Sequence, residues 1–161
     1  MCGIAGYYAG EPLGEDAGRL RLQRMGAALR HRGPDAAGVW LDERRGVGFA
    51  HQRLAIVELS SAGDQPMRSA SGRYVPCYNG EIYNHGELRR ELENQGRAPV
   101  WRGRSDTETL LAALDAWGLD PTLQRLVGMF AFAVWDERHG LVHLARDRFG
   151  EKPLYYGRGR D

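Results

Sequence analysis

The residue best suited to covalent chemistry in this chain is Cys2, which directly follows the initiator methionine. Trimming of Met1 would leave a thiol and a free α-amine on one residue, a nucleophile and a base within reach of each other. Reference pKa values are about 8.5 for a cysteine thiol and about 7.7–8.0 for an α-amine. Near neutral pH part of such an amine is unprotonated and can accept the thiol proton. Cys2 therefore predicts an amine-assisted nucleophile, and the alternative is a small residue that opens a buried strand.

Three other positions carry groups that could hold a small polar substrate. Arg53 ends an apolar run and is either a solvated strand end or a clamp that binds a carboxylate through two hydrogen bonds. Asn79-Gly80 suits a type I′ hairpin turn, but a helix start follows it, which leaves the side-chain amide and the backbone N–H for another use. Asp106, taken alone, is a first-turn acid favoured by the helix dipole. Residue types alone keep both interpretations of each position open.

The composition argues against several classes of protein. The chain has 161 residues, with 22 basic and 21 acidic side chains and a formal net charge of +1. This balance gives no electrostatic reason to expect binding to nucleic acid or to an anionic membrane. The two cysteines cannot form a disulfide framework, and the sequence shows no signal peptide, long apolar run or lipidation motif. We therefore expect a cytoplasmic protein with one domain over residues 1–161, and no metal site, because no histidine has metal-ligand spacing.

Apolar runs bounded by turn residues predict the strands. Cys2 would stand at the beginning of the first strand, a rigid place to mount a nucleophile. Pro76 lies inside another strand, which favours an edge position in a sheet or a bulge. The expected strands are residues 3–9, 37–41, 47–53, 74–78, 128–136 and 141–146, followed by a charged loop and a last strand that ends at Tyr156.

Helical periodicity and N-terminal signals predict the helices. Apolar residues at i, i+3 and i+7 indicate a helix that starts with Asp16 as its N-cap. Asn84 with Glu87, and Ser105 with Glu108, have the spacing of capping boxes, and each pair is followed by an apolar helix face. Seven or eight strands with two consecutive helices in the middle favour an α+β fold in which two mainly antiparallel sheets face each other and helices cover the outer faces.

Six stretches together resemble the class II glutamine amidotransferase (glutaminase) domain of glutamine-hydrolysing asparagine synthetases. Any one of them is a weak signal, but six in the right order make coincidence very unlikely. That family has the four-layer αββα sandwich of N-terminal nucleophile hydrolases. The resemblance covers essentially the whole chain through Cys2–Gly6, His31–Asp35, Arg53–Val57, Asn79–Asn84, Ser105–Glu108 and Arg146–Tyr156.

The resemblance implies a role for each candidate residue. Cys2 would attack the side-chain carboxamide of L-glutamine, and the Asn79 amide and Gly80 N–H would form the oxyanion hole. Arg53 would bind the substrate α-carboxylate, and Asp106 the α-ammonium. Arg32 and Asp35 are expected to shape a loop. The remaining pocket residues implied are Glu81, close to Asp106, and the backbone of Leu54, Ala55, Ile56 and Val57.

The resemblance also implies what lies outside this sequence. Members of the family continue into further glutaminase strands and an ATP-dependent synthetase domain that consumes the ammonia, so we expect the domain to be incomplete at its C-terminus. We expect no cofactor in this chain, with ATP and Mg²⁺ belonging to the synthetase domain. Expected partners are L-glutamine, a synthetase domain or subunit, and in one arrangement a second copy in a homodimer. Two other functions stay open: a non-catalytic glutamine-binding or partner-docking module, and the ammonia-supplying domain of a specialised amide-forming or cyclising synthetase.

Overall fold

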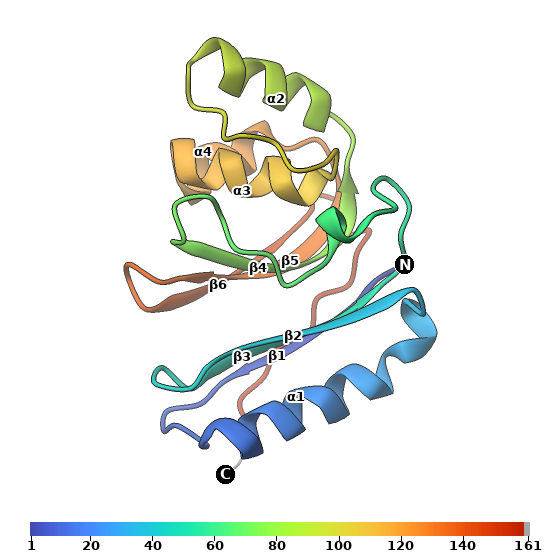
Figure 1. The fold of residues 1–161 in the computed structure, drawn as a ribbon, viewed down its shortest axis with the longest axis vertical. Coiled ribbons are helices and arrows are strands. Elements are labelled where there is room, and N and C mark those ends of the chain that lie inside the picture. Colours follow the sequence, from blue (N-terminus) through green and yellow to red (C-terminus); the bar gives the residue numbers. More distant parts are fainter. Residues whose placement is uncertain (160–161) are drawn as a thin grey trace.

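The computed structural model describes residues 1–159. Its described strands form two antiparallel sheets of three strands each, which face each other with helices on both outer sides. Figure 1 shows the four layers in order: helices α2, α3 and α4, then the sheet β4-β5-β6, then the sheet β1-β3-β2, and last the helix α1. This is the predicted αββα arrangement.

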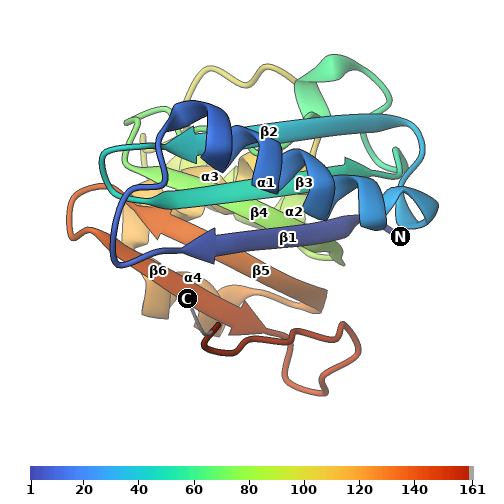
Figure 2. The same cartoon turned by 90° about the horizontal axis from the view of Figure 1, so that it is seen from below.

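The first sheet carries the N-terminus of the protein. Its strands are β1 (Gly3–Tyr8), β3 (Val47–Arg53) and β2 (Ala36–Asp42), with β3 in the middle. Helix α1 (Glu15–Ala28) lies across the outer face of this sheet, as Figure 2 shows from below. Its Leu22 is fully buried and packs so closely on Gly48 that a side chain at that glycine would meet the leucine at 2.5 Å.

The second sheet carries the other three helices. Its strands are β4 (Tyr74–Ile82), β5 (Gly128–Asp136) and β6 (Leu141–Arg146), and β4 is an edge strand, as Pro76 predicted. The helices are α2 (His85–Asn94), α3 (Asp106–Trp117) and α4 (Leu119–Arg125). Two 3₁₀ turns, Arg30–Arg32 and Ser61–Gly63, lie in the loops that surround the chain start.

Alternation along β4 divides the core into two clusters. Tyr74, Tyr78 and Ile82 pack with the leucines of α3 under the helical layer. Val75 and Cys77 point to the opposite face and pack with residues of both sheets, including Phe49 and Trp135. Residues at odd positions of β4 therefore face the interior between the sheets, and those at even positions face the helices.

Several details of the predicted elements were wrong. Helix α1 begins at Glu15 after Gly14, so Asp16 is inside the helix and caps nothing. Asn84 precedes α2 but does not cap it, because its side chain bonds Arg125 O at 2.9 Å and Val127 N at 3.0 Å. The described residues contain six strands, and the segment before Tyr156 forms no strand.

The capping box predicted at α3 is half formed. The Ser105 side chain accepts a hydrogen bond from Glu108 N at 3.2 Å, as expected of an N-cap. The Glu108 carboxylate does not return to Ser105. It accepts instead from the backbone N–H groups of Arg102 and Gly103, at 2.8 and 3.2 Å, so it holds the loop that leads into the helix.

A buried histidine between the sheets predicts a pH-dependent stability. His51 is 1 % exposed; its Nε2 donates to Tyr78 O at 3.1 Å, and its Nδ1 has no partner among the described residues. Burial is the main cause that lowers the pKa of His51 to about 4, so the unfolded chain binds a proton there that the folded chain excludes. Above pH 6.5 both states hold His51 neutral, so this residue does not reduce the free energy of unfolding. As the pH falls from 6.5 toward 4, protonation of the unfolded chain lowers the free energy of unfolding by about 3 kcal/mol.

We expect His51→Gln to flatten this part of the stability curve. The measurement is urea unfolding at a series of pH values between 7 and 4.5, a range chosen to stay above the titration of most carboxylates. His31→Gln, which replaces an exposed histidine, is the matched control and should keep the wild-type slope. Equal slopes for all three proteins would contradict the prediction.

Candidate active site

One pocket at the end of the sandwich brings together six of the residues predicted from the sequence: Cys2, Arg53, Ile56, Val57, Gly80 and Asp106. Figure 1 shows why they meet, because the chain start, the loop after β3 and the end of β4 lie on the same side of the molecule. The other residues that line the pocket are Glu58, Gly63, Gln65, Tyr78, Ser105 and Thr107.

Cys2 is held at the start of β1 by two neighbouring loops. Arg32 Nε donates to the Cys2 carbonyl at 3.1 Å, and Gly33 approaches β3 so closely that a side chain there would collide with the Gln52 carbonyl. Leu54 N lies 3.4 Å from Cys2 Sγ and donates to it, while Sγ lies 3.7 Å from Leu54 O. A backbone N–H that points at the sulfur stabilises negative charge there, which suits a nucleophile.

Arg53 is not the solvated strand end that its sequence position allowed, because it is only 7 % exposed. Its Nη1 donates to Ser60 O at 2.9 Å and to Asp64 Oδ1 at 2.6 Å, and its Nη2 donates to Glu58 O. These bonds use three of the five guanidinium N–H groups, and the described residues offer no hydrogen bond to Nε. The Nε–H and the second Nη2–H remain for a carboxylate in the pocket.

Asp106 is the first residue of α3 and is 6 % exposed. Its Oδ2 accepts from Tyr78 Oη at 2.6 Å and from Ile82 N at 3.0 Å, and its Oδ1 accepts from Thr107 N at 2.9 Å. Burial, followed by the nearby Asp106 charge, raises the pKa of Tyr78 well above its usual value, so the phenol stays a donor. A carboxylate with about four acceptor positions can still receive an ammonium group beside these three donors.

The alternation of the β4–β5 ladder sets the direction of the Gly80 N–H. Tyr78 N donates to Gln65 Oε1 at 2.9 Å, and Ile82 N donates to Asp106, so both point away from β5. In an antiparallel pair the direction repeats every second residue, and the Gly80 N–H between them therefore points to the same free edge. That edge borders the pocket, which leaves this N–H available to a negative oxygen.

Asn79 lies on the opposite face of β4 from Tyr78, toward the first sheet. Cys77 Sγ donates to Ala50 O at 3.4 Å, and His51 Nε2 contacts the Tyr78 carbonyl, so β4 and β3 are in contact across the two sheets at this point. The pocket that contains Cys2, Arg53 and Asp106 does not include Asn79 among its lining residues. Asn79 is 4 % exposed, and no hydrogen bond among the described residues uses its side-chain amide. The amide is therefore uncommitted among the described residues, and its role in the oxyanion hole stays a prediction.

The strand itself differs from the prediction at this point. Asn79, Gly80 and Glu81 lie inside β4, which continues to Ile82, and they pair with Ala131, Phe130 and Met129 of β5. The expectation that Asn-Gly forms no hairpin is correct, but the reason is the long edge strand and not an early helix. A side chain at Gly80 would collide with the Met129 carbonyl, so the position suits glycine.

The structure does not place every predicted residue in the pocket. Ile56 and Val57 line it, whereas Leu54 and Ala55 contribute through their backbone: Leu54 to the sulfur, and Ala55 by donating its N–H to Asp35 Oδ2 at 2.8 Å. Glu81 is half-buried on β4 and is not a lining residue. The substrate-binding roles implied for Leu54, Ala55, Ile56, Val57 and Glu81 stay predictions.

Sequence reasoning missed six pocket residues: Glu58, Gln65 and Tyr78, and also Gly63, Ser105 and Thr107. The Gln65 side chain accepts from Tyr78 N at 2.9 Å and donates to Tyr78 O at 3.3 Å. It therefore satisfies the backbone groups of Tyr78 that face away from β5. Tyr78 was visible only as the end of a strand, although its position next to Asn79 was a usable signal. The polar run that contains Glu58 and Gln65 offered none.

Metal-binding groups and membrane-spanning helices are both absent from the part of the chain that the structure describes. Among residues 1–159, no group of three or more His, Cys, Asp or Glu side chains could hold a metal ion. In the same residues no helix has the length and apolar character needed to cross a lipid bilayer.

A solved structure shares the fold of this chain. Glutamine phosphoribosylpyrophosphate amidotransferase from Bacillus subtilis, in complex with ADP and GMP, superposes with a TM-score of 0.63 over 83 % of this chain and 35 % of its own. The two sequences are 21 % identical, so the likeness concerns the fold alone.

The particular family follows from the sequence comparisons. The chain belongs to the glutamine amidotransferase domain family, whose model matches residues 1–161. It is 41 % identical, over 97 % of its length, to asparagine synthetase [glutamine-hydrolyzing] 1 of B. subtilis, and 42 % identical, over 99 %, to a putative asparagine synthetase of Mycobacterium bovis. The chain spans about a quarter of the length of these curated relatives, 24 % and 26 % respectively.

Proposed function

We propose that this protein hydrolyses the side-chain amide of L-glutamine to glutamate and ammonia through a thioester on Cys2. The observation that carries the proposal is the single pocket in which a thiol, the free edge of a buried guanidinium and a buried carboxylate converge. An amino acid carries an anionic and a cationic group on one carbon, and Arg53 and Asp106 offer the opposite charge for each. With both groups held, the side-chain amide is presented to the sulfur.

The chemistry requires removal of Met1, so that the α-amine of Cys2 can act as base. Sγ attacks the carboxamide carbon and its proton passes to the amine, while the C=O bond opens to an oxyanion bound by the Gly80 N–H and the Asn79 amide. Collapse breaks the C–N bond, and the amine returns the proton to the departing ammonia. Water then adds to the thioester, loses a proton to the same amine and releases glutamate with the thiol restored.

The fate of the ammonia is proposed from the relatives. Because they are named asparagine synthetases, we propose that a synthetase domain or subunit accepts the ammonia in an ATP- and Mg²⁺-dependent amidation in the cytoplasm, where a homodimer is one assembly to test. This chain alone contributes the ammonia-producing site, and we propose that it uses no cofactor of its own.

The test is turnover of L-glutamine by protein whose N-terminus has been checked by intact mass. We expect one glutamate and one ammonia per glutamine consumed, and no turnover in a fraction that retains Met1. Binding of glutamine without turnover by protein that begins at Cys2 would overturn hydrolysis and favour a glutamine-binding module.

A further inference from the structure

Glu58 occupies a position that neither the predicted site nor the proposed reaction uses. It lies in the loop that follows Arg53, lines the pocket, and is half-buried. Its two ends belong to different interactions: the backbone carbonyl faces Arg53, and the side chain crosses to the segment that precedes α3.

The backbone of Glu58 fixes the carboxylate-binding side of the pocket. Its carbonyl accepts from Arg53 Nη2, and the neighbouring Ser60 carbonyl accepts from Nη1 at 2.9 Å. The Glu58 side chain stiffens the same turn, because Oε1 accepts from Ser60 N at 2.9 Å and from Ser60 Oγ at 2.7 Å. The orientation of the guanidinium thus depends on the shape of this loop.

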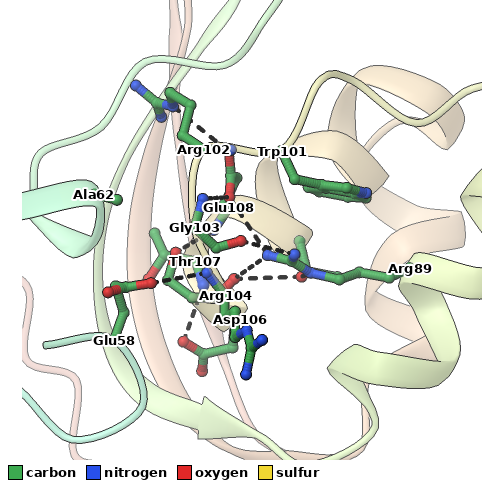
Figure 3. Close-up of polar contacts among 12 residues, drawn as sticks. Glu58, Ala62, Arg89, Trp101, Arg102, Gly103, Arg104, Asp106, Thr107 and Glu108 are labelled. Carbon is green, nitrogen blue, oxygen red and sulfur yellow. Dashed lines mark hydrogen bonds and ion pairs between the residues drawn. The ribbon is translucent and has the colours of Figure 1, made fainter. Parts of the chain in front are cut away.

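The other carboxylate oxygen of Glu58 reaches the ammonium-binding side. Oε2 accepts from Arg104 N at 2.8 Å, two residues before Asp106. A side chain at Gly103 would lie 2.6 Å from this oxygen and 2.9 Å from the Ala62 side chain, so the two loops are in close contact here. Figure 3 shows the Glu58 side chain extending toward Arg104 from the loop that bears Ala62.

The segment that Glu58 contacts is also held from behind. Arg89 of α2 donates to Gly103 O at 2.9 Å and to Ser105 O at 3.0 Å, and it stacks on Trp101 with 4.1 Å between the guanidinium carbon and the ring centre. Figure 3 places Arg89 and Trp101 on the side of this segment opposite to Glu58. The segment that precedes α3 is therefore bound to α2 on one side, through Arg89, and to the loop after Arg53 on the other side, through Glu58.

We propose that Glu58 is a positioning residue that sets the spacing between Arg53 and Asp106 for the two charged groups of an α-amino acid; this rests on the proposed function. The carboxylate and the ammonium of such a substrate are attached to one carbon, so their protein partners must keep one separation. Glu58 is the residue whose main chain holds one partner and whose side chain holds the backbone leading to the other.

The charge of Glu58 supports this role. Hydrogen bonds from the Arg104 backbone, and then from Ser60, lower the pKa of Glu58 to about 2, so the carboxylate is ionised at any pH at which the site would work. Hydrogen bonds to an ionised acceptor are stronger than those to a neutral one.

The experiment measures the Kd of L-glutamine by calorimetry for Glu58→Ala and Glu58→Gln, each combined with Cys2→Ala so that turnover does not interfere. We expect the Ala variant to bind about 10- to 100-fold more weakly, since a displacement near 1 Å has effects of this size, and the Gln variant to fall between it and the parent. In the Cys2 protein the same loss should appear in KM, with kcat changed little. Iodoacetamide should alkylate Cys2 at the parental rate, because this reaction does not depend on the binding of charged substrate groups by Arg53 and Asp106.

A measurement of substrate selectivity distinguishes a changed distance between Arg53 and Asp106 from a general loss of structure. Glutamine without its α-amino group uses only the Arg53 side, so the preference for glutamine over this analogue should shrink in Glu58→Ala. Glu91→Ala removes a partly exposed acid of α2 that lies 3.6 Å from Arg125 and accepts from Gln95 Nε2 at 3.0 Å, and it should change neither quantity. Unchanged affinity and preference in a folded Glu58→Ala protein would overturn the positioning role alone, whereas no glutamine binding by the parent would overturn the proposed function as well.

Discussion

Replacement of Cys2 by alanine is expected to abolish glutamine hydrolysis, with a loss of at least about 10³-fold in kcat, because no other group can form the thioester. The described residues contain one other cysteine, Cys77, and its environment is the opposite of that of Cys2. Cys77 is 1 % exposed between the sheets, its thiol donates to Ala50 O, and burial raises its pKa far above the usual value. It can be neither a thiolate nor a substitute nucleophile.

The measurement is glutamate release at saturating L-glutamine for the parent, Cys2→Ala, Cys2→Ser and Cys77→Ala. Cys2→Ser keeps the α-amine and nearly the same volume, and it tests whether the sulfur itself is needed. Cys77→Ala should lose stability through the small cavity it leaves and keep its activity. Equal rates for the parent and Cys2→Ala would refute the role of the cysteine, provided that intact mass shows Met1 to be absent from both.

Much of the layered fold could be predicted because its strands carry local signals. The strands β2 and β3, and likewise β5 and β6, are apolar runs joined by short turns, and each two form an antiparallel pair in the structure. The loops that hold Cys2 were also predicted in outline. Arg32 and Asp35, expected to shape a loop, do so by binding the Cys2 carbonyl and the Ala55 N–H.

The details that could not be predicted depend on partners far away in the sequence. Asn84 has the right type and spacing for a capping box, but Arg125 and Val127, about 40 residues later, compete for both ends of its amide. Glu108 similarly binds the loop before α3 and the guanidinium of Arg89 at 3.4 Å. A local pattern lists what a side chain can do, and tertiary contacts decide which of these it does.

The same distinction explains the site. The type of each residue indicated what Arg53 and Asp106 could bind, yet only the three-dimensional contacts reveal that both are buried and partly occupied by protein acceptors and donors. Gln65 was invisible because its role is to bind the main chain of Tyr78, and main-chain groups leave no mark in a sequence.

The oxyanion hole supplies the second large effect: Asn79→Ala should lower kcat by about 10²- to 10³-fold and leave KM for L-glutamine nearly unchanged. The reason is that the amide is proposed to meet a charge that exists only in the transition state, while Arg53 and Asp106 bind the substrate before reaction. Asn79 is separable from Gly80 by mutation, because its donor is a side chain. At position 80 every residue except proline retains the N–H, and any side chain there collides with β5.

Asn79→Asp sharpens the test, since it keeps the shape and replaces the donor by a negative group facing a developing negative charge. We expect it to be at least as slow as Asn79→Ala, measured under conditions in which circular dichroism shows both variants folded. The uncommitted state of the amide among the described residues makes this a test of catalysis and not of stability: with no hydrogen bond of its own to lose, Asn79→Ala removes a donor that the folded protein does not use. A rise in KM at constant kcat would instead assign Asn79 to substrate binding, and the Gly80 N–H would then have to stabilise the oxyanion without a side-chain partner.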